Sequence, residues 1–193
     1  MGRDHVLSTF SGPANRALVL SHDCPVPKQP GVYIWYFRSV PPMVPISDCI
    51  ERHGGHLLYA GISPATNRNP QCRQTLRSRI RYHFRGNAAG STLRRTLGIL
   101  LEPISGHALR RVGSGERYTL TTAGEAWLND WLATHALVCW CEDPAPWKLE
   151  VELMRTQSLP LNIQGNDQHA FYPTLRRVRA EALARARELP VCN

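Results

Sequence analysis

Tyr33, Tyr59, Arg79 and His83 are the first side chains in this sequence whose types and spacing could support chemistry. The two tyrosines stand on two predicted strands, and Arg79 and His83 lie four residues apart on a predicted helix, so they share one face of it. An arginine fork favours bidentate contact with a phosphate. Taken singly, however, a strand tyrosine is usually packed in a core, and a lone Arg–His pair is usually solvated.

Glu150 is the most informative carboxylate. The apolar residues Trp147, Val151 and Met154 follow one another at helical spacing and predict one buried stripe, and Glu150 falls about 60° from its centre. A carboxylate aimed toward a core is costly unless a cation, a metal ion or a donor meets it. A salt bridge with Arg79 would satisfy it. A magnesium ion would also suit it, because Mg²⁺ keeps several waters and needs few protein ligands.

The elements that must position these residues follow from hydrophobic periodicity and turn residues. Residues 32–37 and 56–62 predict two strands of an antiparallel hairpin with a long connection, and residues 136–141 predict a third strand. Residues 108–121 predict a basic hairpin. Helices are predicted over residues 75–85, 92–101, 122–134, 147–157 and 174–189.

The positive charge is concentrated in one stretch. The 193 residues include 23 Lys+Arg and 15 Asp+Glu, a net charge of +8. Residues 72–117 contain ten arginines and two acids, so this stretch accounts for the whole excess. An anionic polymer is therefore the first partner to consider, and a solvated surface is the alternative. The candidate phosphate contacts are Arg77, Arg81, Arg94, Arg95, Arg110, Arg111 and Arg117.

Several classes of protein are excluded by what the sequence lacks. No run approaches the roughly 18 apolar residues of a membrane span, and the first residues contain no apolar signal segment. The six cysteines are scattered without paired zinc-ligand spacing. We therefore expect a cytoplasmic protein with reduced cysteines and no membrane partner.

The ordered set of motifs resembles the GIY-YIG nuclease domain. Either tyrosine motif alone would be weak, but the set in this order is specific. It implies an α/β (α+β) fold, with a small antiparallel β-sheet flanked by helices. The matching segments are Pro30-Gly31-Val32-Tyr33, Leu58-Tyr59-Ala60-Gly61, the helix carrying Arg79 and His83, Glu150, and Asn162 twelve residues further on.

The resemblance implies a role for the first three of these residues. Tyr33 matches the proposed general base toward the attacking water, and Tyr59 matches a tyrosine that positions water and phosphate. Arg79 matches the arginine that stabilises the scissile phosphate. An unperturbed tyrosine has a pKa near 10 and is a poor base at neutral pH. We expect Arg79 and a metal ion at Glu150 to favour the phenolate of Tyr33.

The other matched residues complete the implied site. His83 matches a histidine of the homing and restriction branches of the family. Glu150 matches the single metal-binding carboxylate, which implies one Mg²⁺ or Mn²⁺ ion as cofactor, and Asn162 matches the asparagine that closes the site. Ile62 departs from the pattern, because many members have lysine or serine there.

The chain is expected to form one domain over residues 1–193. Residues 30–86 and 136–165 would form the core, and residues 87–135 an insertion of helix, hairpin and helix that resembles part of a winged helix. This insertion would either grip DNA through its arginines or serve a structural purpose. The last helix, residues 173–189, is expected to pack on the domain.

Two functions are consistent with the sequence. The first is a metal-dependent DNA endonuclease that hydrolyses a phosphodiester bond by tyrosine-assisted attack of water. The second is a non-catalytic DNA-binding module on a nuclease-like scaffold. The sequence leaves open a role in restriction, a mobile element, repair or defence, the recognised sequence or structure, whether RNA is cut, and the oligomeric state.

Overall fold

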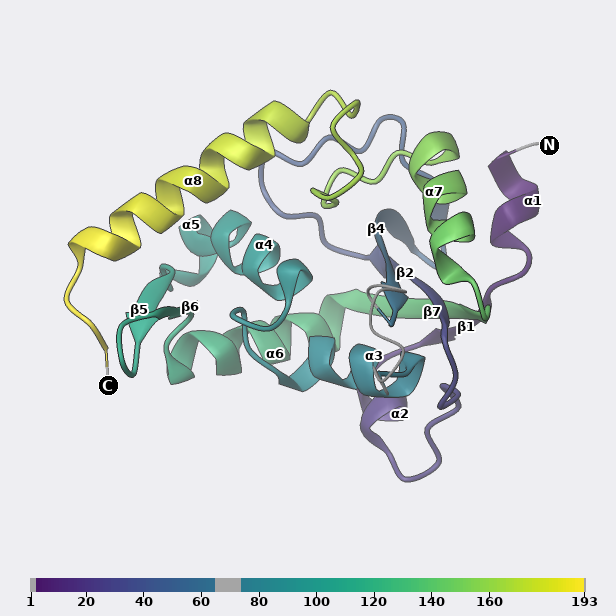
Figure 1. Ribbon diagram of the computed structural model, residues 1–193, viewed down its shortest axis with the longest axis horizontal. Coiled ribbons are helices and arrows are strands. Elements are labelled where there is room, and N and C mark those ends of the chain that lie inside the picture. Colours follow the sequence, from purple (N-terminus) through teal and green to yellow (C-terminus); the bar gives the residue numbers. More distant parts are fainter. Residues whose placement is uncertain (1–2, 65–73, 193) are drawn as a thin grey trace.

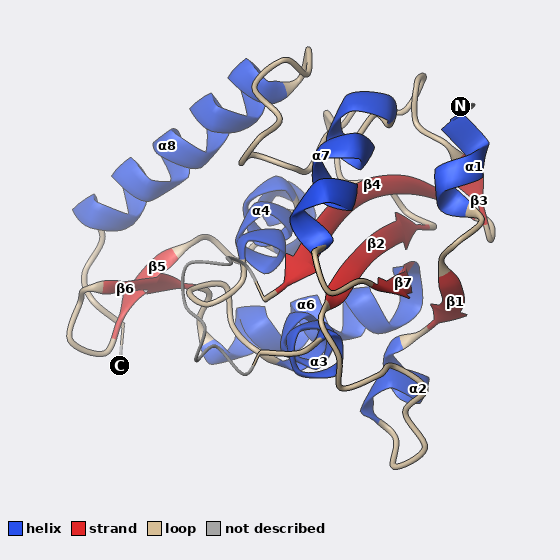
Figure 2. Ribbon diagram, turned by 45° about the vertical axis from the view of Figure 1, so that its right-hand side comes forward, coloured by secondary structure: helices blue, strands red, loops and turns tan. Residues whose placement is uncertain are grey.

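A computed structural model describes residues 3–64 and 74–192 of the chain. Its centre is a five-stranded antiparallel sheet with strand order β1-β7-β2-β4-β3 (Figure 2). The strands are β1 (Ser11–Ala14), β2 (Gly31–Phe37), β3 (Glu51–Arg52), β4 (Gly55–Ser63) and β7 (Ala136–Glu142). The expected antiparallel sheet with flanking helices is confirmed. Cys72 and Arg73, part of the basic stretch, lie outside the described residues.

Alternation along β2 divides the core into two layers. Tyr33, Trp35 and Phe37 point to one face of the sheet, and the residues between them point to the other. Helices α3 (Leu76–Arg85) and α6 (Thr122–His135) cover the first face, where Trp131 stacks on Phe37. Helix α7 (Pro146–Thr156) covers the second face (Figure 2). The two sides of the sheet therefore carry different parts of the predicted site.

Helix α3 forms where the sequence predicts it. Thr75 caps its N-terminus in a capping box with Ser78. Leu76, Ile80 and Phe84 repeat at four-residue spacing and are completely buried against the sheet. This packing fixes the rotation of the helix about its axis, so Arg79 and His83 take defined positions relative to the sheet.

The predicted stripe of α7 is wrong at Val151, which is 67% exposed. Trp147 and Met154 of that stripe pack partly against the core, as does Leu149, while Pro146 and Leu153 are buried. The buried face of α7 therefore packs against the aliphatic side chains of the sheet's second face. Glu150 lies at the flank of the buried stripe and is half-buried.

The insertion and the C-terminal helix pack on one another. Helices α4 (Thr92–Leu100) and α5 (Glu102–Ser105) precede the basic hairpin of β5 (Arg110–Val112) and β6 (Arg117–Thr119). Helix α8 (Tyr172–Glu188) runs along α4 and β5, as expected for a packing helix (Figure 1). The backbone beyond α8 then pairs with β5 through Cys192.

The N-terminal elements were not predicted. Helix α1 (Arg3–Leu7) and helix α2 (Arg16–Leu20) flank β1, which pairs with β7 at the edge of the sheet. Arg77 and Arg81 of α3 hold the segment after α2 by donating to its backbone carbonyls. In the described part of the chain, no helix is both long and apolar enough to cross a membrane.

Candidate active site

The pairing of β2 with β4 places the two tyrosines. Tyr33 is the cross-strand partner of Gly61, and Trp35 is that of Tyr59, so Tyr33 and Tyr59 lie on the same face of the sheet. A Cβ atom on Gly61 would lie 2.5 Å from the hydroxyl oxygen of Tyr33 and 2.7 Å from its ring carbon Cζ. The ring of Tyr33 therefore crosses β4 at Gly61, where no side chain stands in its way.

His83 meets Tyr33 from the facing helix. The Nε2 atom of His83 lies 2.8 Å from the hydroxyl of Tyr33, and its Nδ1 atom lies 2.7 Å from the hydroxyl of Ser91. Ser91 is also the N-cap of α4 and accepts from the backbone N–H of Arg94. These contacts make a buried chain of polar groups from Tyr33 through His83 to the start of α4.

Burial keeps the side chains of Tyr33 and His83 in this series of polar groups uncharged. Burial lowers the pKa of His83 well below its ordinary value, and the charges of Arg79 and Arg94 lower it further. Burial also raises the pKa of Tyr33, against the opposing effect of the nearby Arg79 guanidinium. Arg79 favours the phenolate of Tyr33, as expected, but desolvation is the larger effect and keeps the hydroxyl protonated without a metal ion at Glu150.

Arg79 and Glu150 face the same cleft but do not pair with each other. Arg79 donates from Nη1 to the carbonyl of Gly90, and its buried Nε has no partner. Glu150 makes no hydrogen bond or ion pair with any residue that the structure describes, and burial raises the pKa of its carboxyl group. The salt-bridge alternative for these two residues is thus not observed: Arg79 interacts with Gly90 and with the Tyr33 hydroxyl, and the carboxylate of Glu150 has no partner among the described residues.

The cleft has a volume of about 850 Å³, and Tyr59, Ala60, Gly61 and Ile62 of β4 line it. Tyr33, Tyr59, Arg79, Glu150 and Asn162 all line it. His83 lies behind Tyr33 and is completely buried. The structure thus brings together all six residues that the resemblance singled out, from both faces of the sheet.

Asn162 closes the edge of the sheet next to the cleft. Its side-chain oxygen accepts from the backbone N–H of Ala60 at 2.9 Å, and its side-chain amide donates to the carbonyl of Ala60 at 2.8 Å. The backbone N–H of Leu161 donates to the carbonyl of Leu58 in the same way. This segment therefore satisfies edge groups of β4 as a further strand would, and it holds β4 against the cleft.

The donor set fits one hard divalent cation. Glu150 is the only carboxylate among the described residues that line the cleft, and the described residues contain no cluster of three acidic, histidine or cysteine ligands. A single unpartnered carboxylate suits an ion such as Mg²⁺, which takes its other ligands from water and from substrate phosphates. A two-metal centre normally needs more protein ligands.

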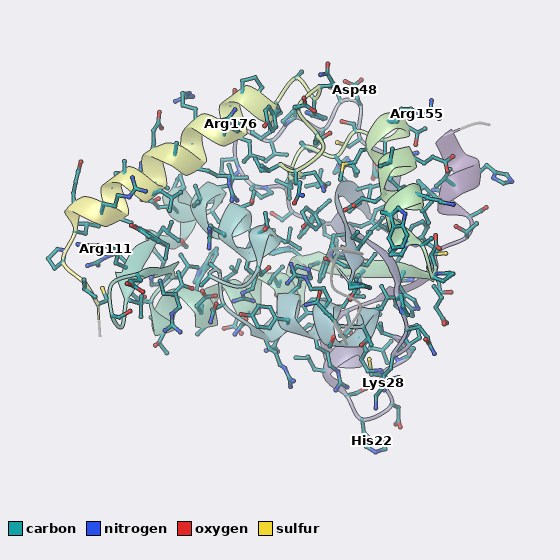
Figure 3. All side chains as sticks on the ribbon, in the orientation of Figure 1. His22, Lys28, Asp48, Arg111, Arg155 and Arg176 are labelled. Atoms are coloured by element: carbon teal, nitrogen blue, oxygen red, sulfur yellow. The ribbon has the colours of Figure 1, made fainter. Side chains whose placement is uncertain are left out.

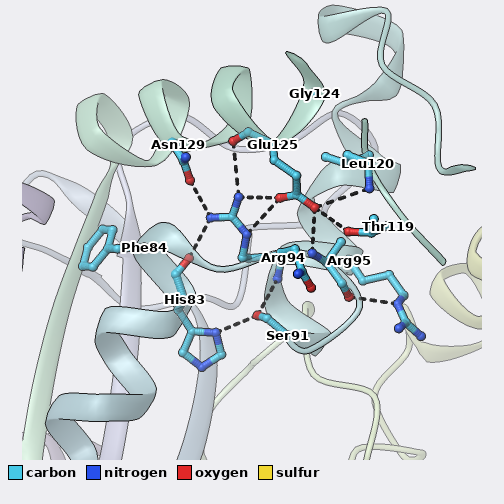
Figure 4. A network of polar contacts seen from close by, with 12 residues as sticks. His83, Phe84, Ser91, Arg94, Arg95, Thr119, Leu120, Gly124, Glu125 and Asn129 are labelled. Carbon is cyan, nitrogen blue, oxygen red and sulfur yellow. Dashed lines mark hydrogen bonds and ion pairs between the residues drawn. The ribbon is translucent and has the colours of Figure 1, made fainter. Parts of the chain in front are cut away.

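The predicted phosphate contact is wrong for Arg94. Its side chain is completely buried in a network with Glu125, Asn129 and the carbonyl of His83 (Figure 4). Glu125 in turn accepts from the backbone of Ala88 and of Leu120 and from the hydroxyl of Thr119. Arg94 thus ties the insertion to α3, and its donors are used inside the protein.

Most of the other predicted contacts also donate to backbone carbonyls. The Nε and Nη2 atoms of Arg77, of Arg81 and of Arg95 all do so, so this edge of each fork is not available to a phosphate. Arg110 and Arg111 donate to the carbonyls of Pro190 and Leu189. Figure 3 shows Arg111 at the end of the molecule away from α7.

Arg117 differs from these arginines. It is exposed, and it lines a smaller hollow beside Arg95 and Tyr118. Of the seven arginines predicted to contact phosphate, it has the most open position.

Sequence reasoning missed several residues of the site. Ser91 caps α4, and nothing in its residue type indicated a contact with His83. The cleft wall also includes Thr92, Arg155 and a loop between α7 and α8, with Gln164, Gln168 and His169. This loop has no regular pattern, so only the structure could place it.

A family model for the GIY-YIG catalytic domain matches residues 31–181. The chain belongs to the GIY-YIG family. The match extends from the first tyrosine motif through the insertion into α8, and it identifies the domain as a nuclease. Comparison with curated proteins and with solved structures finds no match. What distinguishes this GIY-YIG domain must therefore be read from its own residues.

Gly61→Ala tests the steric account of the second motif. The new methyl group cannot fit beside the Tyr33 hydroxyl, so we expect a loss of about 1–3 kcal/mol in the free energy of unfolding. Chemical denaturation measures it. Gly98→Ala is the control, because a Cβ there meets only the flexible side chain of Leu120. Equal stabilities of the two variants would contradict the account.

Glu125→Gln tests the buried network. It leaves the charge of Arg94 buried without a counter-charge, and we expect a loss of about 3–5 kcal/mol in the free energy of unfolding. The double variant Arg94→Met/Glu125→Gln removes both charges and should recover part of this loss. Urea denaturation of the three proteins gives the comparison. A double variant less stable than Glu125→Gln would show that the network does not act through charge compensation.

Proposed function

We propose that the protein is a metal-dependent DNA endonuclease that hydrolyses a phosphodiester bond. The observation that carries this proposal is the hydrogen bond between the buried Tyr33 hydroxyl and the neutral His83, at the wall of a cleft that Arg79 and the unpartnered carboxylate of Glu150 also line. Proton transfer, charge stabilisation and cation binding are the three requirements of phosphodiester hydrolysis. The chain supplies residues for all three.

Tyr33 and His83 together take the proton from the attacking water. A neutral imidazole donates through one nitrogen and accepts through the other. With its proton on Nδ1, His83 donates to Ser91 and accepts from the Tyr33 hydroxyl. Tyr33 can then accept the water proton on its oxygen while it passes its own proton to Nε2. This arrangement does not require a resting phenolate.

Arg79 stabilises the phosphate in this scheme. Arg79 lines the cleft beside both tyrosines, and the charge that develops on the phosphate oxygens would meet its guanidinium group. A bound phosphate also compensates the charge of Arg79. Because that charge is one reason for the low pKa of His83, substrate binding would make His83 a better proton acceptor.

Glu150 would hold the divalent ion, and we propose Mg²⁺ or Mn²⁺. When bound, the ion would neutralise phosphate charge and lower the pKa of a coordinated water. Tyr59 would position the phosphate and the water, and Asn162 would keep β4 in place at the side of the cleft. DNA is the proposed partner, and the cytoplasm is the proposed location.

A non-catalytic DNA-binding module is the second candidate. Ile62 lines the cleft and supplies no polar group where many members of the family have one. Such a module would bind DNA with the salt sensitivity that phosphate contacts give, as the endonuclease would, but it would not cut DNA with any metal ion.

Glu150→Gln distinguishes these functions. Supercoiled plasmid, branched DNA and single strands are incubated with the protein and with Mg²⁺ or Mn²⁺, and nicked products are measured. We expect the variant to lose at least about a hundredfold in rate, because the ion loses its protein ligand. Glu152→Gln is the matched control, two residues away on the same helix and outside the cleft. Cleavage by Glu150→Gln at the unmutated rate would refute the proposed mechanism.

The Tyr33–His83 pair predicts that the cleavage rate does not change with pH near neutrality. Burial keeps His83 unprotonated and Tyr33 protonated at neutral pH, so the cleavage rate should not change between neutral and mildly alkaline pH. It should fall in acid as the raised pKa of Glu150 is crossed. A free phenolate would instead give about a tenfold rise per pH unit. Single-turnover rates across this range decide between them.

Tyr33→Phe removes the hydroxyl and keeps the ring. We expect the cleavage rate to fall by about 10²–10⁴ with unchanged DNA affinity, because only proton transfer is lost. Single-turnover cleavage and fluorescence anisotropy measure the two quantities. A large loss of affinity would show that the hydroxyl serves binding instead.

A further inference from the structure

The smaller hollow beside Arg117 has a volume of about 380 Å³ and lies on the insertion. The connection between α3 and α4, helix α4 and the β5–β6 hairpin all contribute to its wall. The described wall residues are Ala89, Arg95, Ser114, Glu116, Arg117 and Tyr118. None of them lines the cleft, and none is among the six residues matched to the motifs of the family. The proposed mechanism therefore leaves this hollow without a purpose.

Two arginines join the hollow to the cleft through one short segment. Arg79 of the cleft donates to the carbonyl of Gly90 at 3.0 Å. Arg95 of the hollow donates to the two preceding carbonyls, those of Ala88 and Ala89, at 3.1 and 3.0 Å. The two guanidinium groups therefore hold successive peptide groups of the same segment.

The hollow and the cleft are close enough for one nucleic-acid strand to reach both. Ala89 lines the hollow and Thr92 lines the cleft. Three residues of chain span at most about 11 Å. Successive nucleotides of one strand rise by about 3.4 Å along a duplex, so this span corresponds to on the order of three nucleotides. A strand whose phosphate meets Arg79 can therefore place another phosphate at the hollow.

The hollow offers positive charge that is not used inside the protein. Arg117 is exposed and makes no hydrogen bond or ion pair with any residue that the structure describes. Arg95 is half-buried, and its bonds from Nε and Nη2 fix its position and leave Nη1 without a described partner. Glu116 adds a carboxylate, but no described ion pair joins it to either arginine. The described wall thus has a net positive charge.

Neutral donors complete the wall of the hollow. Ser114 is exposed at the tip of the hairpin, between Gly113 and Gly115, which both have the left-handed backbone of a tight turn. The hydroxyl of Tyr118 accepts from Nε of Arg187 at 3.3 Å, so it keeps its own proton to donate. Hydroxyl and guanidinium groups are the donors that proteins commonly present to phosphate oxygens.

We propose that this hollow binds a backbone phosphate of the DNA through Arg117 and Arg95, a few nucleotides from the phosphate held by Arg79. This inference rests on the proposed function and deepens it. The β5–β6 hairpin is then a substrate-binding arm at Arg117, while its Arg110 and Arg111 hold the C-terminal segment. A second phosphate contact would align the strand in the cleft whatever its base sequence.

Arg117→Gln tests the proposal. A fluorescein-labelled duplex and a labelled single strand are titrated with the protein in EDTA, so that metal-dependent cleavage does not occur, and binding is measured by fluorescence anisotropy over a range of salt concentrations. We expect the slope of log K against log[salt] to become shallower by about 0.9 for the duplex and about 0.7 for the single strand, the effect of one lost phosphate contact.

Arg85→Gln is the matched control. Arg85 is an exposed arginine of the same basic stretch and also has no described partner, but it lines neither the cleft nor the hollow. We expect its salt slope to equal that of the unmutated protein. Glu116→Gln makes the opposite change of charge in the hollow. At low salt it should tighten DNA binding by about two- to fivefold, the size of an exposed charge interaction.

Each result bears on the proposal. An unchanged slope in Arg117→Gln, an equal loss of slope in Arg85→Gln, or weaker binding by Glu116→Gln would overturn the inference. If the unmutated protein cleaves DNA with Mg²⁺ or Mn²⁺ and the slope of Arg117→Gln is unchanged, the inference fails and the endonuclease function stands. If the unmutated protein neither binds nor cleaves any nucleic acid tested, both proposals fail together.

Discussion

The hydrogen bond between Tyr33 and His83 is the constraint on which the site depends. Both groups are buried, and a buried polar group without a partner costs about 1–3 kcal/mol, so each must find the other. Their meeting requires that α3 be fixed in rotation by Ile80 and Phe84, and that β4 carry no side chain at Gly61. The two tyrosine motifs, which contain Tyr33 and Gly61, are therefore parts of a single steric arrangement.

Ser91 extends this constraint into the insertion. It fixes the second nitrogen of His83 and caps α4, and the first turn of α4 brings in Arg94 and its partner Glu125. The insertion is consequently continuous with the core of the domain through buried polar contacts. A change in α4 or α6 would be felt at His83, although neither helix carries a motif of the family.

Several arginines of this protein have a structural purpose that a count of charges does not reveal. The sequence contains 23 basic residues, of which only Lys28 and Lys148 are lysine. A guanidinium group has five donors in a fixed plane, so one side chain can join two backbone carbonyls. Arg77 and Arg81 do so at the N-terminal segment. Much of the positive charge is therefore compatible with a structural purpose.

The sequence predicted the positions of residues that depend on a local pattern or belong to a known motif. Helix α3, the β2–β4 hairpin and the meeting of Glu150 with the tyrosines all follow from short patterns. Strand β1 was missed because its pairing with β7 is tertiary, and Ser-Gly-Pro-Ala has little intrinsic strand preference. The burial of Arg94 was missed because Glu125 lies 31 residues away, and only packing brings the two together.

In the proposed mechanism, the charges around the cleft make the proton affinity of His83 depend on the bound substrate. Without an anion, Arg79 lowers the proton affinity of His83, and burial holds Tyr33 in its protonated form. In the proposed mechanism, a phosphate against Arg79 would compensate that charge when a proton acceptor is needed. Substrate binding would then raise the proton affinity of His83, although burial remains the largest cause of its low pKa. Such a site would be a poor catalyst for the hydrolysis of esters that carry no negative charge.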